Sequence, residues 1–176
     1  MVRLFLEQGV DVDAVNPNGW TALMGVAQNG HADVVNLLLE SKADVNAAKQ
    51  DGYTALLLAA CNGRVDIVQQ LLVSKADVDA ANYVGRKAPI LAAIRGHSDV
   101  VQRLLASKAD VNATDDDGYT ALMGAAQNGH SDVVELLEAA QAAQVVATGS
   151  SSSSSSSGGG GSAHNDDSNP EKRARR

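Results

Sequence analysis

The amino-acid sequence predicts an all-α repeat protein, in which helix pairs stack into an elongated solenoid. Glycines recur every 33 residues through most of the 176-residue chain, and short apolar stretches at helical spacing lie among them. Aromatic residues make up only 3% of the chain, which disfavours an aromatic-cored β-sandwich and suits closely packed small helices. The apolar residues are concentrated before Ala147, so the core is expected there.

Two series of glycines define the repeat. Both keep a period of 33 residues without insertions, which is far more specific than any single short motif. The first series is Gly19, Gly52, Gly85 and Gly118, and the second is Gly30, Gly63, Gly96 and Gly129.

Each unit is predicted to contain a first helix between its two glycines. The stretches 21–27, 54–60 and 120–126 are apolar and begin with Thr, a residue that caps helix N-termini by accepting a backbone hydrogen bond. The third unit has Lys87 in this place, followed by Pro89, which is tolerated in a first helical turn. We expect the third unit to be the weak link, because a lost cap costs about 1 kcal/mol.

A second helix is predicted after each second-series glycine. These segments carry apolar residues at helical spacing and an Asp in the first turn, where the helix dipole favours negative charge. An Ala-Asp-Val stretch then leads through Asn, Asp and Gly to the next unit, as a turn or hairpin does. The clearest second helices are 33–39, 66–72 and 99–105.

These units resemble the ankyrin repeat, whose pattern combines the Thr-led first helix, the glycine turn, the Val-Val and Leu-Leu second helix and the Ala-Asp-Val-Asn turn. The resemblance covers most of residues 1–147 and implies an ankyrin-type α-solenoid with a β-hairpin finger beside each helix pair. Residues 1–15 match only the second helix and finger of a unit. Four full units, called one to four below, are readable at 16–48, 49–81, 82–114 and 115–147.

The chain departs from the ankyrin pattern at two repeated positions. Apolar residues replace the His that ties the finger to the first helix, so looser fingers are expected; they are Met24, Leu57, Ile90 and Met123. Lysines replace the Gly that ends the second helix; they are Lys42, Lys75 and Lys108. A positive φ there costs a non-glycine residue about 1 kcal/mol, partly offset by a cation at the helix C-terminus.

The two ends of the predicted stack differ. Met1 falls within a second helix, and we expect a missing upstream unit, although a fragment, a truncated gene model or a partner-covered face would give the same pattern. Residues 138–144 are strong helix formers, so the last helix should run on and cap the stack. Residues 148–176 hold Ser and Gly runs that bury too little surface to offset ordering entropy, and we expect a disordered tail.

Charge and composition narrow the classes of partner. Residues 1–147 carry 10 Lys and Arg against 18 Asp and Glu, so this part repels nucleic-acid backbones and anionic membranes. The single cysteine, Cys61, excludes an internal disulfide and a multi-Cys zinc site, and no secretory or membrane-spanning segment is apparent. We expect an intracellular protein, cytoplasmic rather than nuclear. The segment Lys172–Arg176 is read as a nonspecific basic end, with a nuclear-import signal as the alternative.

No arrangement of catalytic or metal-binding residues is apparent, and we expect neither a cofactor nor a metal. His31, His97 and His130 share one repeat position, but Arg64 takes it in unit two. A structural role at the start of the second helix is therefore favoured over a metal site. Cys61 lacks the nearby His or basic pocket that a catalytic thiol needs.

Binding has better support than catalysis. The residue after each first-series glycine is of a type enriched in interface hot spots, which predicts a ladder along one edge of the stack. For each residue alone, covering the base of a finger is about as good an explanation as contact with a partner. The ladder consists of Trp20, Tyr53, Arg86 and Tyr119.

The resemblance implies further contact residues, because ankyrin repeats usually hold partners with the finger tips and the exposed side of the first helix. Charge along the array is uneven, with a net +3 in unit three and −6 in unit four, which a partner could read; solvated faces with local ion pairing are the alternative. The implied contact positions are Asn18, Gln28, Asn29, Asp51, Cys61, Asn62, Val84, Ile94, Arg95, Asp117, Gln127 and Asn128.

We therefore expect a noncatalytic, monomeric protein-protein interaction module that binds a protein partner through its concave face and fingers. Two alternatives stay open. The chain could be the ankyrin-repeat segment of a larger enzyme or signalling protein truncated at its N-terminus, or a purely structural spacer.

Overall fold

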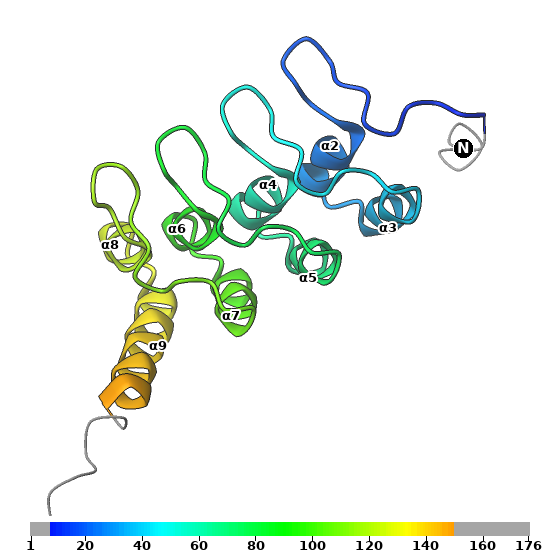
Figure 1. Cartoon of the computed structure of the whole chain (residues 1–176). Helices are drawn as coiled ribbons and strands as arrows, with labels where there is room; N and C mark the ends of the chain where they lie inside the picture. The colour runs from blue at the N-terminus through cyan, green and yellow to red at the C-terminus, as the bar shows by residue number, and fades with distance from the viewer. Residues whose placement is uncertain (1–7, 150–176) are drawn as a thin grey trace, which may run out of the picture.

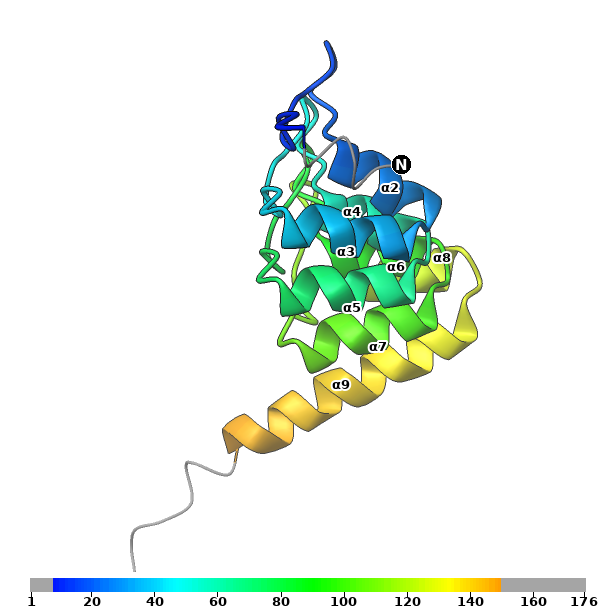
Figure 2. The ribbon, with the colours of Figure 1, turned by 90° about the vertical axis from the view of Figure 1, so that its right-hand side faces the viewer.

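The computed structural model describes residues 8–149, which form eight helices arranged as four pairs in a curved row (Figure 1). The two helices of each pair run antiparallel, and the pairs stack with their axes nearly aligned (Figure 2). The predicted all-α repeat architecture is confirmed. The first helices of the pairs are α2 (Ala22–Asn29), α4 (Ala55–Cys61), α6 (Ala88–Ile94) and α8 (Ala121–Gln127). The second helices are α3 (Ala32–Glu40), α5 (Val65–Val73), α7 (Ser98–Ala106) and α9 (Ser131–Gly149).

Threonine caps start three of the four first helices, as predicted. The hydroxyl oxygens of Thr21, Thr54 and Thr120 each accept a hydrogen bond from the backbone N–H three residues on, at 3.3, 3.3 and 3.1 Å. Lys87 precedes α6 without such a bond, and Pro89 lies in the first turn of that helix. The expected loss of a cap in unit three is therefore present in the structure.

The second helices end in the strained conformation that the lysine substitutions predicted. Lys42, Lys75 and Lys108 have φ values of 65°, 66° and 67°. This left-handed geometry lets the following residue return a backbone hydrogen bond to the helix, as Ala76 N–H does to the Leu71 carbonyl at 2.9 Å. Three units thus adopt a conformation that a glycine would take at lower cost.

The core runs continuously along the stack between the two rows of helices. Each first helix packs against the first helix of the next unit, and small side chains such as Ala59, Ala60, Ala92 and Ala93 let their backbones approach closely. Leucine and valine from the second helices complete this core. Each fully buried Leu or Val stabilises the fold by about 1.5–3 kcal/mol relative to an exposed one.

The β-hairpin fingers that the resemblance implied are not confirmed by the structure. Among residues 8–149 no strand forms, and three fingers each hold a single antiparallel bridge; the bridged pairs are Ala48–Thr54, Ala81–Lys87 and Thr114–Thr120. In two of the fingers, a side chain stabilises the turn by accepting backbone hydrogen bonds. Asn82 Oδ1 accepts the N–H groups of Val84 and Arg86, and Asp115 Oδ1 accepts those of Asp117 and Tyr119. These side chains engage N–H groups that a longer strand ladder could have used.

The last helix runs on, as its composition predicted. α9 has 19 residues against nine in each other second helix, and it includes two residues of the stretch assigned to the tail. Gln141 Nε2 donates to Asn112 Oδ1 at 3.0 Å, and Asn112 Nδ2 donates to Gln144 Oε1 at 3.2 Å, so α9 is tied to the turn that follows α7. Residues 1–7 of the predicted partial unit and residues 150–176 of the predicted tail lie outside the described residues. Within residues 8–149, no helix combines the length and apolar character needed to cross a bilayer.

Candidate protein-binding surface

The four ladder residues lie along the side of the stack that the fingers form, which we call the finger edge. All four are half-buried. Trp20, Tyr53 and Tyr119 rest against the core, each at the point where a finger enters its first helix. Lys49 lies between two of these rings, with its ammonium nitrogen 5.2 Å from the centre of Trp20 and 5.0 Å from that of Tyr53. The ammonium also forms an ion pair with Asp51. Finger two is thus held by cation–π contacts to its own ring and to that of unit one.

An ion pair joins the fingers of units three and four. Arg86 Nε donates to Asp115 Oδ2 at 3.0 Å, and the guanidinium carbon lies 5.8 Å from the centre of the Tyr119 ring. Burial by itself raises the pKa of the Asp115 carboxyl. Hydrogen bonds from the Tyr119 amide, the Arg86 guanidinium and the Asp117 amide outweigh burial, so this pKa lies below its ordinary value.

These contacts show what the ladder does within the chain. Arg86 and Tyr119 share one cluster, and Trp20 and Tyr53 share another through Lys49. The ladder therefore covers the finger bases, and each side chain still keeps part of its surface toward solvent. Lys49 was missed in the sequence, because nothing in a linear pattern shows that one lysine lies between rings of two units.

The finger tips present the exposed part of the predicted surface. Asn18, Val84 and Asp117 are exposed, whereas Asp51 is half-buried by its pair with Lys49. Tyr83, which the sequence reasoning passed over, is 73% exposed beside Val84. The sequence feature that could have pointed to Tyr83 is its aromatic side chain, at a repeat position where the other units have a polar residue or Pro.

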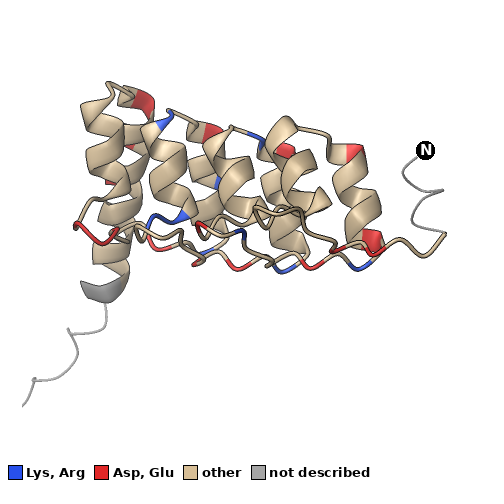
Figure 3. Ribbon diagram, turned by 90° about the horizontal axis from the view of Figure 1, so that it is seen from above, with Lys and Arg blue, Asp and Glu red and all other residues tan. Residues whose placement is uncertain are grey.

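Neighbouring fingers are bonded to one another near these tips. The Tyr83 N–H donates to the Asp51 carbonyl at 3.0 Å, and the Asp116 N–H donates to the Val84 carbonyl at 3.1 Å. Seen from above, acidic and basic residues both occur along the side of the stack formed by the fingers and turns (Figure 3). The finger tips of units two to four therefore form one continuous edge.

The predicted positions at the ends of the first helices divide into two groups. Gln28 is half-buried, while Arg95 and Gln127 are exposed, and Gln127 accepts a hydrogen bond from the Tyr119 hydroxyl at 2.7 Å. The other group consists of asparagines whose side-chain amides donate to the carbonyl four residues back, at 2.8 Å in each case; they are Asn29, Asn62 and Asn128. The Leu58 and Gly124 carbonyls also accept the backbone N–H groups of Asn62 and Asn128, at 3.2 and 3.3 Å, so the side-chain amides reinforce the helix ends. The sequence reasoning missed this structural role.

The shared His and Arg position links one unit to the next. Arg64 Nε donates to the Gln28 carbonyl at 3.1 Å, and His97 and His130 place Nε2 3.2 Å from the carbonyls of Cys61 and Ile94. A carbonyl only accepts hydrogen bonds, so Nε2 carries the proton in both histidines. These contacts agree with the predicted structural role at the start of the second helix.

Within residues 8–149, no three His, Cys, Asp or Glu side chains lie close enough together to hold a metal ion. A shallow hollow of about 520 Å³ lies on the second-helix side and is lined by Val65, Asp99, Gln102, Arg103 and Ala106. It brings a single carboxylate near a single guanidinium, with no nucleophile beside them.

The comparison with protein families decides how this stack is classified. The family model for ankyrin repeats, which spans three copies, matches residues 1–82 and again residues 78–148. The chain belongs to the ankyrin repeat family. Ankyrin repeats generally serve as protein-protein interaction modules and are generally noncatalytic. Comparison with curated proteins finds no matching relative.

Proposed function

We propose that this ankyrin repeat protein is a noncatalytic binding module whose finger edge holds a protein partner. The observation that carries the proposal is the bonded row of fingers, which presents Tyr83 and Val84 in the open and four half-exposed ladder residues beneath them. Aromatic and arginine side chains dominate the energetics of protein interfaces.

The chemistry of the edge favours a partner with an apolar side chain flanked by basic residues. Lys49 and Arg86 are already paired with Asp51 and Asp115, whereas Asp116 and Asp117 at the finger-four tip are exposed. Complementary charge steers association and suppresses wrong partners. An apolar centre at Tyr83 beside an acidic tip is the arrangement that such a partner fits.

The test is to identify proteins labelled in proximity to the full chain and to measure their binding to purified variants. Tyr83→Ala should weaken binding of a true finger partner by about tenfold or more, as hot-spot truncations do. Val73→Ala is the matched control, because Val73 is also 73% exposed but lies on α5, in the second-helix row. Equal binding by wild type and Tyr83→Ala would contradict the proposed edge.

The ladder residues provide a second test of the proposed function. Replacing Trp20, Tyr53 and Tyr119 together by Ala should also abolish capture, but these rings pack on the core, so stability must be followed in parallel. Circular dichroism that stays near wild type while binding is lost would support contact with the partner. Binding that survives in the folded triple variant would reject the ladder as a contact surface.

A further inference from the structure

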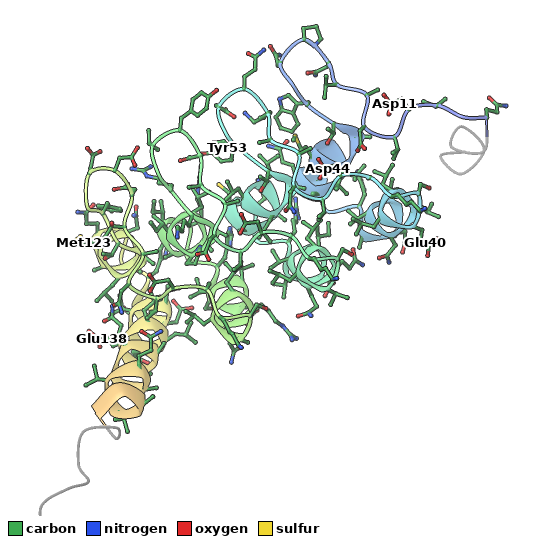
Figure 4. The ribbon with its side chains drawn as sticks, in the orientation of Figure 1. Asp11, Glu40, Asp44, Tyr53, Met123 and Glu138 are labelled. Carbon is green, nitrogen blue, oxygen red and sulfur yellow. The ribbon has the colours of Figure 1, made fainter. Side chains whose placement is uncertain are left out.

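The side of unit four that faces away from unit three is apolar and uncovered by any described residue. Met123 is 49% exposed, whereas the matching residues Met24, Leu57 and Ile90 are at most 1% exposed because the next unit covers them. Ala126 is exposed too, although its three counterparts are fully buried. In Figure 4, Met123 and Glu138 lie at the same end of the row. We call the surface formed by Met123, Ala126, Gly129, Val134 and Glu135 the end face.

The backbone of the end face repeats the geometry that receives a neighbour elsewhere in the stack. A Cβ atom on Gly96 would lie 2.5 Å from the ring of His130, and one on Gly63 would lie 2.8 Å from that of His97. The same atom on Gly129 would meet nothing within 4 Å. A space that a cationic or imidazole side chain fills at three internal junctions is therefore open here.

A backbone acceptor is presented beside this space. The carbonyls of Gln28, Cys61 and Ile94 accept an N–H from Arg64, His97 and His130 of the following unit. By the 33-residue period, the matching acceptor on the end face is the Gln127 carbonyl. The internal junctions thus indicate an occupant that supplies an Arg or His donor together with apolar side chains.

Charge selects among such occupants. Unit four has six acidic residues and no Lys or Arg, and Glu135 lines a hollow of about 200 Å³ with Ala126, Gly129, His130 and Val134. A second copy of this chain would bring a net charge of −8 over residues 1–147 against this acidic unit. Like charges at an interface oppose association, so a cationic occupant fits and a second copy does not.

We propose that the end face binds a cationic helical segment of another protein, which stacks on unit four as a further unit would. Its apolar side chains cover Met123 and Ala126, and its Arg or His donates to the Gln127 carbonyl. This surface is separate from the finger edge, so the two proposals can fail independently.

The experiment titrates the full chain into two fluorescein-labelled helical peptides and follows their anisotropy. One peptide combines Leu and Ala with Arg, and the other has Glu in place of every Arg. The Arg peptide should bind, and Ala126→Arg should weaken it by about tenfold or more by filling the face and adding a like charge. Met123→Gln should weaken it in the same direction. Both positions are exposed, so neither change should unfold the stack.

Two controls make the result decisive. Ala14→Arg adds the same charge at an exposed loop near the opposite end, and Val73→Ala removes exposed apolar surface from α5, outside both proposed surfaces; both should bind the Arg peptide like wild type. The proposal is overturned if the Glu peptide binds equally well, or if Ala126→Arg and Ala14→Arg weaken binding equally. It is also overturned if light scattering shows a dimer that Ala126→Arg abolishes, since a second copy would then occupy the face.

Discussion

Single residues carry strain in this stack at one repeated place, the lysine that ends each of three second helices. Lys42, Lys75 and Lys108 hold φ near 66°, a region that costs an L-residue about 1 kcal/mol or more relative to glycine. Their cationic side chains lie where the helix dipole is negative, which offsets part of this cost.

Lys75→Gly should therefore stabilise the protein by up to about 1 kcal/mol, measured as the free energy of unfolding in urea. Ser74→Gly is the matched control, because Ser74 has φ of −82° and gains nothing from glycine. That control should destabilise by about 0.4–1 kcal/mol through the entropy of the unfolded chain. A Lys75→Gly variant less stable than wild type would show that the lysine charge outweighs the strain.

A buried carboxylate sets a pH dependence at the residue scale. The pKa of Asp115 in the folded state lies below its ordinary value of 3.8, so the ionised form stabilises the fold above that pH. This stabilisation should be lost as the pH falls from about 4 through the lower folded pKa. Asp115→Asn should lower the free energy of unfolding at about pH 6, and its difference from wild type should shrink toward about pH 2. Asp117→Asn is the control, because it leaves the Arg86–Asp115 ion pair in place.

Helix α6 stands apart from the other first helices, α2, α4 and α8, because it starts without a side-chain cap. Lys87 instead places its ammonium 3.0 Å from Asp79, an exposed pair that contributes about 0–1 kcal/mol. The helix still forms, since its residues from Ala88 to Ala93 are all buried between neighbouring units. Packing thus overrides the local sequence signal here.

Lys87→Thr should add the missing cap and stabilise the protein by about 0.5–1 kcal/mol after loss of the exposed pair. Lys87→Ala measures the loss of that pair alone, and Thr54→Ala should cost about 1 kcal/mol by removing an existing cap. Urea unfolding of the three variants provides the comparison. If Lys87→Thr is no more stable than Lys87→Ala, the absent cap is not what limits unit three.

At the scale of the whole molecule, the repeat predicted most of the fold. The glycine period located all four first helices, leading threonines marked the start of three of them, and residues 138–144 predicted the extension of α9. The β-hairpins are not confirmed, and the hydrogen bonds that Asn82 and Asp115 accept within their turns depend on turn geometry, which a family pattern does not specify.

The candidate binding surface was less predictable than the fold. The ladder residues could be predicted because they share one position of the 33-residue repeat. The pairing of Arg86 with Asp115 and the place of Lys49 between two rings arise only when units stack. The same holds for the end face, since Met24 and Met123 are identical in type and occupy the same repeat position. Their different exposure comes from the neighbour that one of them has.

The bonds between fingers affect the thermodynamics of association. Loops that order only on binding cost entropy, which reduces the affinity that their contacts provide. Here the backbone bonds from Tyr83 to Asp51 and from Asp116 to Val84 fix the relative positions of three fingers beforehand. A partner therefore meets a preorganised edge, and association should proceed with little rearrangement of the backbone on this side.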